Sequence, residues 1–184
     1  SYSDTASVID ELGRVADLSP YLTDDEKAQY VDSFIEEGDI NGDGSLKVFP
    51  VGKSTETLQV NLTDWQKFAD ATGSTLEELS TIEGVTTVAQ RYYEWTDAQT
   101  PDVAGDGRPF FGRDAMANYL IMGSRQLGHD VFDIEGGACS LDLDRTTMKK
   151  LWDNYYVPMV QGWFSAEGKF RSDAVKTGDL VCYV

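Results

Sequence analysis

The residues best suited to chemistry form one short polar cluster between two apolar segments. The cluster consists of Lys53, Ser54, Thr55 and Glu56. It places a cation, two hydroxyl groups and a carboxylate side by side, an array suited to hydrogen bonding with a polyhydroxylated ligand. The flanking residues 46–51 and 57–61 are predicted to be extended strands, so the cluster would lie where two strands meet.

Glu56 is open to three interpretations. The simplest is an ion pair with Lys53 at the end of a strand, the second is ligand binding, and the third is catalysis. Retaining glycosidases need two carboxyl groups about 5 Å apart and inverting ones about 6.5–9.5 Å, a distance that sequence does not give. The chain has no G-x-S-x-G motif, and its lone histidine, His129, lies in a predicted turn.

A second candidate site is a loop with the pattern D-x-N-x-D-G. Asp39, Asn41 and Asp43 stand where the oxygen ligands of a calcium loop would stand, followed by Gly44. The twelfth position, however, is Pro50 instead of a bidentate glutamate. A surface turn explains the same residues without an ion, so we predict no metal and keep a calcium loop as the alternative.

Two further positions are candidates because of the elements around them. Arg113 and Asp114 follow a predicted strand and open a predicted helix, where backbone N–H groups point outward. Asp114 is also a suitable helix cap. Trp163 lies near a helix end, where an aromatic ring can stack on a sugar, although a core position is favoured for any one of the aromatic residues.

Helical and strand patterns alternate along the chain and indicate an α/β fold with helices packed on a small mixed sheet. Predicted helices begin at capping residues and end at glycines. Helices are predicted from Thr23 to Gly38, from Thr63 to Gly73, from Asp114 to Gly128 and from Asp144 to Tyr156. Further helices are predicted over residues 85–95 and 172–178, and a short one is predicted to begin at Ser74. The other strands are predicted at 109–111, 131–132 and 180–184.

Composition excludes several classes of function. A net charge of −17 and a pI near 4.2 argue against nucleic acid as a partner. No stretch reaches the ~18 apolar residues of a membrane span. The two cysteines, Cys139 and Cys182, leave a single bridge open as a possibility. Both chain ends fall within structured patterns, so we expect a fragment of a longer protein.

The segment from Phe49 to Phe68 resembles the crossing between lobes in extracellular solute-binding proteins of sugar ABC transporters (family 1). In that family an F-P-x-x-K/S-S/T-x-E segment ends lobe one, and a strand ending in Asn, followed by a helix with an aspartate, an aromatic residue and Phe, begins lobe two. Phe49-Pro50, Glu56 and Asn61 follow this pattern. The resemblance implies a partial two-lobe fold of the periplasmic-binding-protein type II. Residues 1–52 would end lobe one, 53–57 would cross, and 58–184 would form a truncated lobe two.

The resemblance also implies a function. The chain would capture a small solute, most simply a sugar or oligosaccharide, in a cleft between the lobes without chemistry or a cofactor. The intact protein would deliver it to a membrane permease. Its location would be extracellular, with a lipid anchor outside this chain. The ligand-binding residues carried over are Asp4, Ser54, Thr55, Glu56, Arg113 and Asp114, with Trp163 as a stacking ring. The competing expectations are a carbohydrate-active enzyme using Glu56 and a second carboxylate, and a calcium-dependent surface module.

Overall fold

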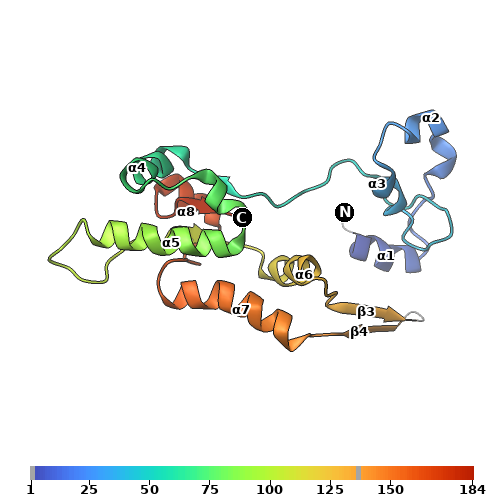
Figure 1. The fold of residues 1–184 in the computed structure, drawn as a ribbon. Coiled ribbons are helices and arrows are strands. Elements are labelled where there is room, and N and C mark those ends of the chain that lie inside the picture. The colour runs from blue at the N-terminus through green and yellow to red at the C-terminus, as the bar shows by residue number, and fades with distance from the viewer. Residues whose placement is uncertain (1–2, 136–137) are drawn as a thin grey trace. The chain divides into compact units, whose positions relative to one another are not determined.

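The structure is a computed structural model that describes residues 3–135 and 138–184 (Figure 1). The chain divides into two compact units, one ending at Thr55 and the other running from Glu56 to Val184. We call them the N-terminal and the C-terminal unit and describe each by itself. The division falls inside residues 53–57, the segment predicted to connect two lobes.

The N-terminal unit consists of short helices joined by turns. Its elements are α1 (Ser3–Glu11), the 3-10 helix η1 (Ser19–Tyr21), α2 (Asp24–Lys27) and α3 (Asp32–Glu36). The predicted capping box is confirmed, since Thr23 Oγ1 accepts from the Glu26 backbone N–H at 3.2 Å and Glu26 Oε2 accepts from the Thr23 N–H at 2.8 Å. The prediction of one continuous helix to Gly38 is wrong. The chain leaves the helix between α2 and α3, where Tyr30 packs edge-on against Phe49, a tertiary contact that overrides local helix propensity.

The strand predicted over residues 46–51 is also wrong, because its backbone groups are bonded to a turn instead of a neighbouring strand. The Leu46 N–H donates to the side chains of Asp17 and Ser19, and the N–H groups of Lys47 and Val48 both donate to the carbonyl of Gly38. Pro50 has no N–H to give to a ladder. Leu46 is nevertheless buried, so the apolar pattern here indicates core packing without a sheet.

The C-terminal unit contains a small mixed sheet of three two-residue strands in the order β1-β5-β2. β5 (Cys182–Tyr183) lies in the centre, antiparallel to β1 (Gln59–Val60) and parallel to β2 (Phe111–Gly112). The predicted strands at 57–61 and 180–184 therefore exist in shortened form. The strand predicted at 109–111 begins two residues later than expected and extends through Gly112.

Helices make up most of the C-terminal unit. They are α4 (Leu62–Thr72), the 3-10 helix η2 (Leu76–Ser80), α5 (Ile82–Asp97), α6 (Met116–Gln126), α7 (Arg145–Val160) and α8 (Arg171–Thr177). A separate hairpin joins β3 (Phe132–Glu135) to β4 (Ala138–Leu141) (Figure 1). Along the part of the chain that is described, none of the helices combines the length and the apolar character needed to cross a bilayer.

Several predicted helix ends are confirmed and others shift. Gly73 and Gly178 follow α4 and α8 with φ angles of 75° and 78°, the left-handed conformation that suits glycine. Asp144 caps α7 by accepting from the Thr147 N–H at 2.7 Å. The cap of α4 is Asn61 rather than Thr63, and the cap of η2 is Thr75 rather than Ser74.

An aromatic core holds the C-terminal unit together. Phe68 on α4 contacts the rings of Trp65, Tyr92 and Phe110, with centroid distances of 5.7, 5.3 and 6.2 Å. Cys182 is fully buried in the same core, and burial raises the pKa of its thiol well above the ordinary value. Cys139 is exposed and both thiols are free, so the bridge that the sequence left open is not formed.

The inner face predicted for α7 is only partly correct. Leu151 is buried as expected, but Trp152 and Tyr156 are 59% and 48% exposed and stack on one another with centroids 4.5 Å apart. On α6, Tyr119 is buried, whereas Met116 and Leu120 are not.

Candidate functional site

A cavity of about 690 Å³ opens in the C-terminal unit, within the range of about 300–1,000 Å³ that is typical of small-molecule sites. It is bounded by η2, the start of α5, β2, α6 and α7. Its apolar wall includes Leu79, Val85, Phe111, Tyr119 and Leu151. Its polar lining includes Glu56, Glu83, Arg113, Lys150 and Asn154, together with Ser80, Thr81 and Gln126.

Glu56 and Arg113, both predicted from the sequence as ligand-binding residues, meet in this cavity as an ion pair. Arg113 donates to Glu56 Oε2, and Asn118 Nδ2 donates to Glu56 Oε1 at 2.5 Å. The side chains of Arg113 and Glu56 are only 10% and 24% exposed, so the pair is largely shielded from water. Both carboxylate oxygens are therefore held in a fixed orientation at the cavity wall.

The sheet and α6 bring these residues together. Glu56 precedes β1 and Arg113 follows β2, and both strands pair with the central β5. Gly112 is required in β2, because a Cβ there would lie 2.6 Å from the Ser165 carbonyl oxygen. Asn118 lies in the first turn of α6. The Glu56–Arg113 pair thus depends on β2, on α6 and on the close approach of the Gly112 backbone to Ser165.

Tyr119 forms part of the wall next to Arg113. The Arg113 guanidinium lies over the Tyr119 ring, 5.5 Å from its centroid, and the Tyr119 hydroxyl donates to the Leu151 carbonyl at 2.8 Å. Burial raises the pKa of Tyr119 to about 12. This hydroxyl therefore remains protonated at neutral pH and serves as a donor that fixes the ring.

A second polar cluster of the cavity joins α5 to α7. Glu83 Oε1 lies 3.2 Å from Lys150 Nζ and accepts from Asn154 Nδ2 at 3.2 Å. The backbone N–H of Glu83 itself, followed by the hydrogen bonds from Lys150 and Asn154, lowers the pKa of the Glu83 carboxyl from its ordinary value, against the raising effect of burial.

The other predicted site residues lie elsewhere. Asp114 does not line the cavity: it accepts from the Arg171 backbone N–H at 3.0 Å and lies 3.4 Å from the buried Arg171 Nε. The prediction that Asp114 caps α6 is wrong, since the cap position is Ala115, whose side chain makes no capping bond. Asp114 instead compensates the charge of a buried arginine. Trp163 packs against the aromatic core.

In the N-terminal unit, Ser54 and Thr55 are exposed. The side chain of Asp4, the remaining predicted ligand-binding residue, lies outside the described residues. Lys53 pairs with Glu37 and lies over the Phe34 ring at 5.3 Å. The expected Lys53–Glu56 ion pair is therefore not formed, and Glu56 pairs with Arg113 instead.

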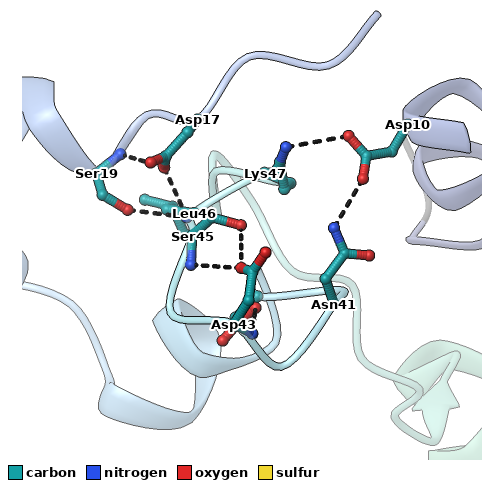
Figure 2. Close-up of polar contacts among 9 residues, drawn as sticks. Asp10, Asp17, Ser19, Asn41, Asp43, Ser45, Leu46 and Lys47 are labelled. Carbon is teal, nitrogen blue, oxygen red and sulfur yellow. Dashed lines mark hydrogen bonds and ion pairs between the residues drawn. The ribbon is translucent and has the colours of Figure 1, made fainter. Parts of the chain in front are cut away.

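The Asp39 loop closes on itself through hydrogen bonds. Asp39 accepts from the N–H groups of Asp43 and Gly44 at 3.1 and 2.8 Å. Figure 2 shows that Asn41 points its amide nitrogen at Asp10, 2.7 Å away, and that Asp43 accepts from Ser45. Within residues 3–135 and 138–184, no three His, Cys, Asp or Glu side chains gather closely enough to hold a metal. The oxygens of this loop act as turn-closing groups.

Sequence reasoning missed Glu83, Lys150 and Asn154 as cavity residues and Asn118 as a partner of Glu56. One signal was available: Lys150 and Asn154 are four residues apart and therefore share a face of α7. No family model, curated protein or solved structure matches this chain. The cavity is therefore understood from its own residues, namely two ion-paired carboxylates beside an apolar, partly aromatic wall.

The pKa shift of Glu83 has a measurable consequence. Because its pKa is lowered in the folded state, the stabilisation by its carboxylate is complete above its ordinary pKa of 4.5 and is lost as the pH falls below that value. We expect Glu83→Gln to destabilise the protein at neutral pH and to differ little from the wild type at about pH 3. Denaturant unfolding at the two pH values measures the difference.

Glu77→Gln is the matched control for this measurement. Glu77 lies on η2 near the same region, is exposed, and forms no ion pair within the described residues. Its substitution should change the free energy of unfolding little at either pH. A Glu83→Gln penalty that stays constant between the two pH values would contradict the assignment of the shift to Glu83.

Proposed function

We propose that the chain captures a small neutral solute, most simply a sugar, in the cavity of the C-terminal unit without chemical change. One observation carries the proposal: Glu56 is held at the cavity wall by Arg113 and Asn118, beside an apolar surface. Ion-paired carboxylate and guanidinium groups offer both acceptors and donors to hydroxyl groups, while their charges balance. Phe111 and Tyr119 belong to the apolar wall of the same cavity.

The geometry supports binding better than catalysis. A general acid or nucleophile needs a carboxylate oxygen directed at the reacting atom. Oε2 of Glu56 accepts from Arg113 and Oε1 accepts from Asn118, so each oxygen already has a partner. Glu83, the other carboxylate of the cavity, is engaged by Lys150 and Asn154. Two carboxylates fixed in this way suit hydrogen bonding to hydroxyl groups.

The setting we propose is the solute-binding protein of an ABC importer with a periplasmic-binding-protein type II-like fold. The support is the crossing pattern between Phe49 and Phe68 and the division of the chain after Thr55, inside the predicted crossing. In this setting the protein is extracellular and lipid-anchored, and it passes its solute to a membrane permease.

The test is a thermal-shift screen of the 184-residue chain with a panel of neutral mono- and oligosaccharides, followed by product analysis. A ligand at a hundred times its Kd should stabilise the protein by about 2.7 kcal/mol. Glu56→Gln should abolish most of that stabilisation, and the saccharide should be recovered unchanged. Glu77→Gln should retain it. Absence of stabilisation by any saccharide, or hydrolysis that disappears in Glu56→Gln, would overturn the proposal.

A further inference from the structure

The only histidine of the chain, His129, lies between α6 and the β3–β4 hairpin, and its ring reaches the start of α7. The ring nitrogen Nε2 has two backbone neighbours, the Asp144 nitrogen at 3.2 Å and the Asp142 carbonyl oxygen at 3.1 Å. We propose that His129 is a pH switch at this junction: the neutral ring accepts from the Asp144 N–H, and the protonated ring donates to the Asp142 carbonyl. This inference does not depend on the proposed function.

The two contacts cannot both be hydrogen bonds in one protonation state. The Asp144 N–H is a donor and the Asp142 carbonyl oxygen is an acceptor. A ring nitrogen with a lone pair accepts from the N–H group, but its lone pair then faces those of the carbonyl. A ring nitrogen that carries a hydrogen donates to the carbonyl, but its hydrogen then faces that of the N–H group. Each state of Nε2 therefore satisfies one of the two neighbours.

The neutral ring is expected to accept. A buried backbone N–H without a partner is rarer in proteins than a carbonyl with an unused lone pair. With its hydrogen on Nδ1, the neutral ring satisfies the Asp144 N–H, and the carbonyl of the exposed Asp142 can bind water instead. Both nitrogens of a protonated imidazole carry a hydrogen. A proton taken up from water therefore ends the bond from Asp144 and starts the bond to Asp142.

The backbone around His129 fixes the ring in this position and leaves it open to water. The His129 N–H donates to the carbonyl of Ser124 on α6 at 2.9 Å, and Ser124 is fully buried. Gly128 has a φ of 83°, the left-handed conformation in which the chain turns away from α6. The His129 side chain is 24% exposed. The ring can thus exchange protons with solvent while its attachment to α6 stays in place.

Charged groups face the ring from the three elements around it. On the side of α6, Arg125 pairs with Asp130 at 3.0 Å, so these two charges offset one another. After the hairpin, Asp142 Oδ1 lies 3.7 Å from Nε2. At the start of α7, His129 acts on the charge of the Asp144 carboxylate. The two carboxylates without a cation of their own, those of Asp142 and Asp144, attract a protonated ring.

The switch changes one bond at the start of α7 and leaves the helix cap intact. Asp144 caps α7 by accepting from the Thr147 N–H at 2.7 Å. This hydrogen bond is the largest cause that lowers the pKa of the Asp144 carboxyl, and His129 lowers it further. The carboxylate therefore stays ionised between about pH 5 and 8, where an imidazole ordinarily changes its charge. Only the bond from the N–H of Asp144 to the ring is lost.

The experiment is ¹⁵N NMR of the full 184-residue chain at about pH 8 and pH 5. The ring signals need no assignment, because the chain has one histidine. We expect the hydrogen on Nδ1 alone at the higher pH and on both nitrogens at the lower. Relative to an unfolded chain, protection of the Asp144 amide against hydrogen exchange should fall about tenfold at the lower pH. Protection of the Thr147 amide, the internal control, should stay unchanged.

Two variants complete the test. Glutamine does not titrate, so His129→Gln should give the Asp144 amide equal protection at both pH values. Asp142→Asn removes a charge but keeps the backbone carbonyl, so it should retain the switch. The proposal is overturned if the neutral ring of the wild type carries its hydrogen on Nε2, if Asp144 protection is independent of pH in the wild type, or if its pH dependence persists in His129→Gln. Loss of the switch in Asp142→Asn would overturn the carbonyl as the partner. The ring signals of the wild type decide even where a variant fails to fold.

Discussion

Replacing Phe68 by alanine is expected to lower the free energy of unfolding of the C-terminal unit by about 3–5 kcal/mol. Phe68 is completely buried, and its ring contacts those of Trp65, Tyr92 and Phe110, with Trp95 at a centroid distance of 5.6 Å. Four rings surround the side chain, so they cannot all move in to fill the space that the substitution leaves. The lost stability combines the hydrophobic free energy that burial of the ring contributes with the cost of the cavity left in its place.

Tryptophan fluorescence during denaturant unfolding measures this loss selectively, because all four tryptophans lie beyond residue 56. Phe132→Ala is the matched control: it is the same substitution on β3, where the phenylalanine is 46% exposed. It should cost less than about 1 kcal/mol. If both substitutions had equal effects, the aromatic core around Phe68 would not be the stabilising centre of this unit.

The helices that could be predicted from the sequence are those whose signals are local. The burial of Trp65 and Phe68 on α4, the end of α8 at Gly178 and the Asp144 cap of α7 all depend on spacings of one to four residues. Such signals are complete within the segment itself. The cap positions that moved by one or two residues, such as Asn61 for Thr63, did so because several neighbouring polar residues could each serve as a cap.

The elements that could not be predicted depend on distant partners. Residues 46–51 have an extended apolar pattern, but a strand also needs a neighbouring strand, and here the backbone bonds go to Gly38 and to side chains near Ser19. The break between α2 and α3 follows from the packing of Tyr30 on Phe49. Trp152 has the spacing of a core residue, yet it is largely exposed and stacks on Tyr156 of the same helix.

Two members of the candidate site, Glu56 and Arg113, were predicted from the sequence, but their pairing was not. Glu56 and Arg113 were both identified from their positions beside strands, whereas their ion pair joins residues 57 positions apart. Lys53 was the obvious local partner for Glu56, but it pairs with Glu37 instead. Glu83 carried no signal of its own, because its role depends on Lys150 and Asn154, which the packing of α5 on α7 brings to it.

Arg113→Met is expected to destabilise the C-terminal unit by about 2–3 kcal/mol, because it leaves Glu56 largely shielded from water without its cation. Methionine keeps much of the aliphatic volume, so loss of packing contributes little. The substitution also removes the guanidinium that lies over Tyr119. Denaturant unfolding followed by tryptophan fluorescence measures the change.

The double variant Arg113→Met with Glu56→Gln tests the cause of that loss. A neutral glutamine needs no cation and still accepts from Asn118, so the double variant should recover at least half of the stability lost in the single variant. Lys176→Met is the surface control: Lys176 is 74% exposed and pairs with Asp173 one turn away on α8, so its substitution should cost less than about 1 kcal/mol. If the double variant were less stable than Arg113→Met alone, the unpaired carboxylate would not be the cause, and the loss would lie in the contact between Arg113 and Tyr119.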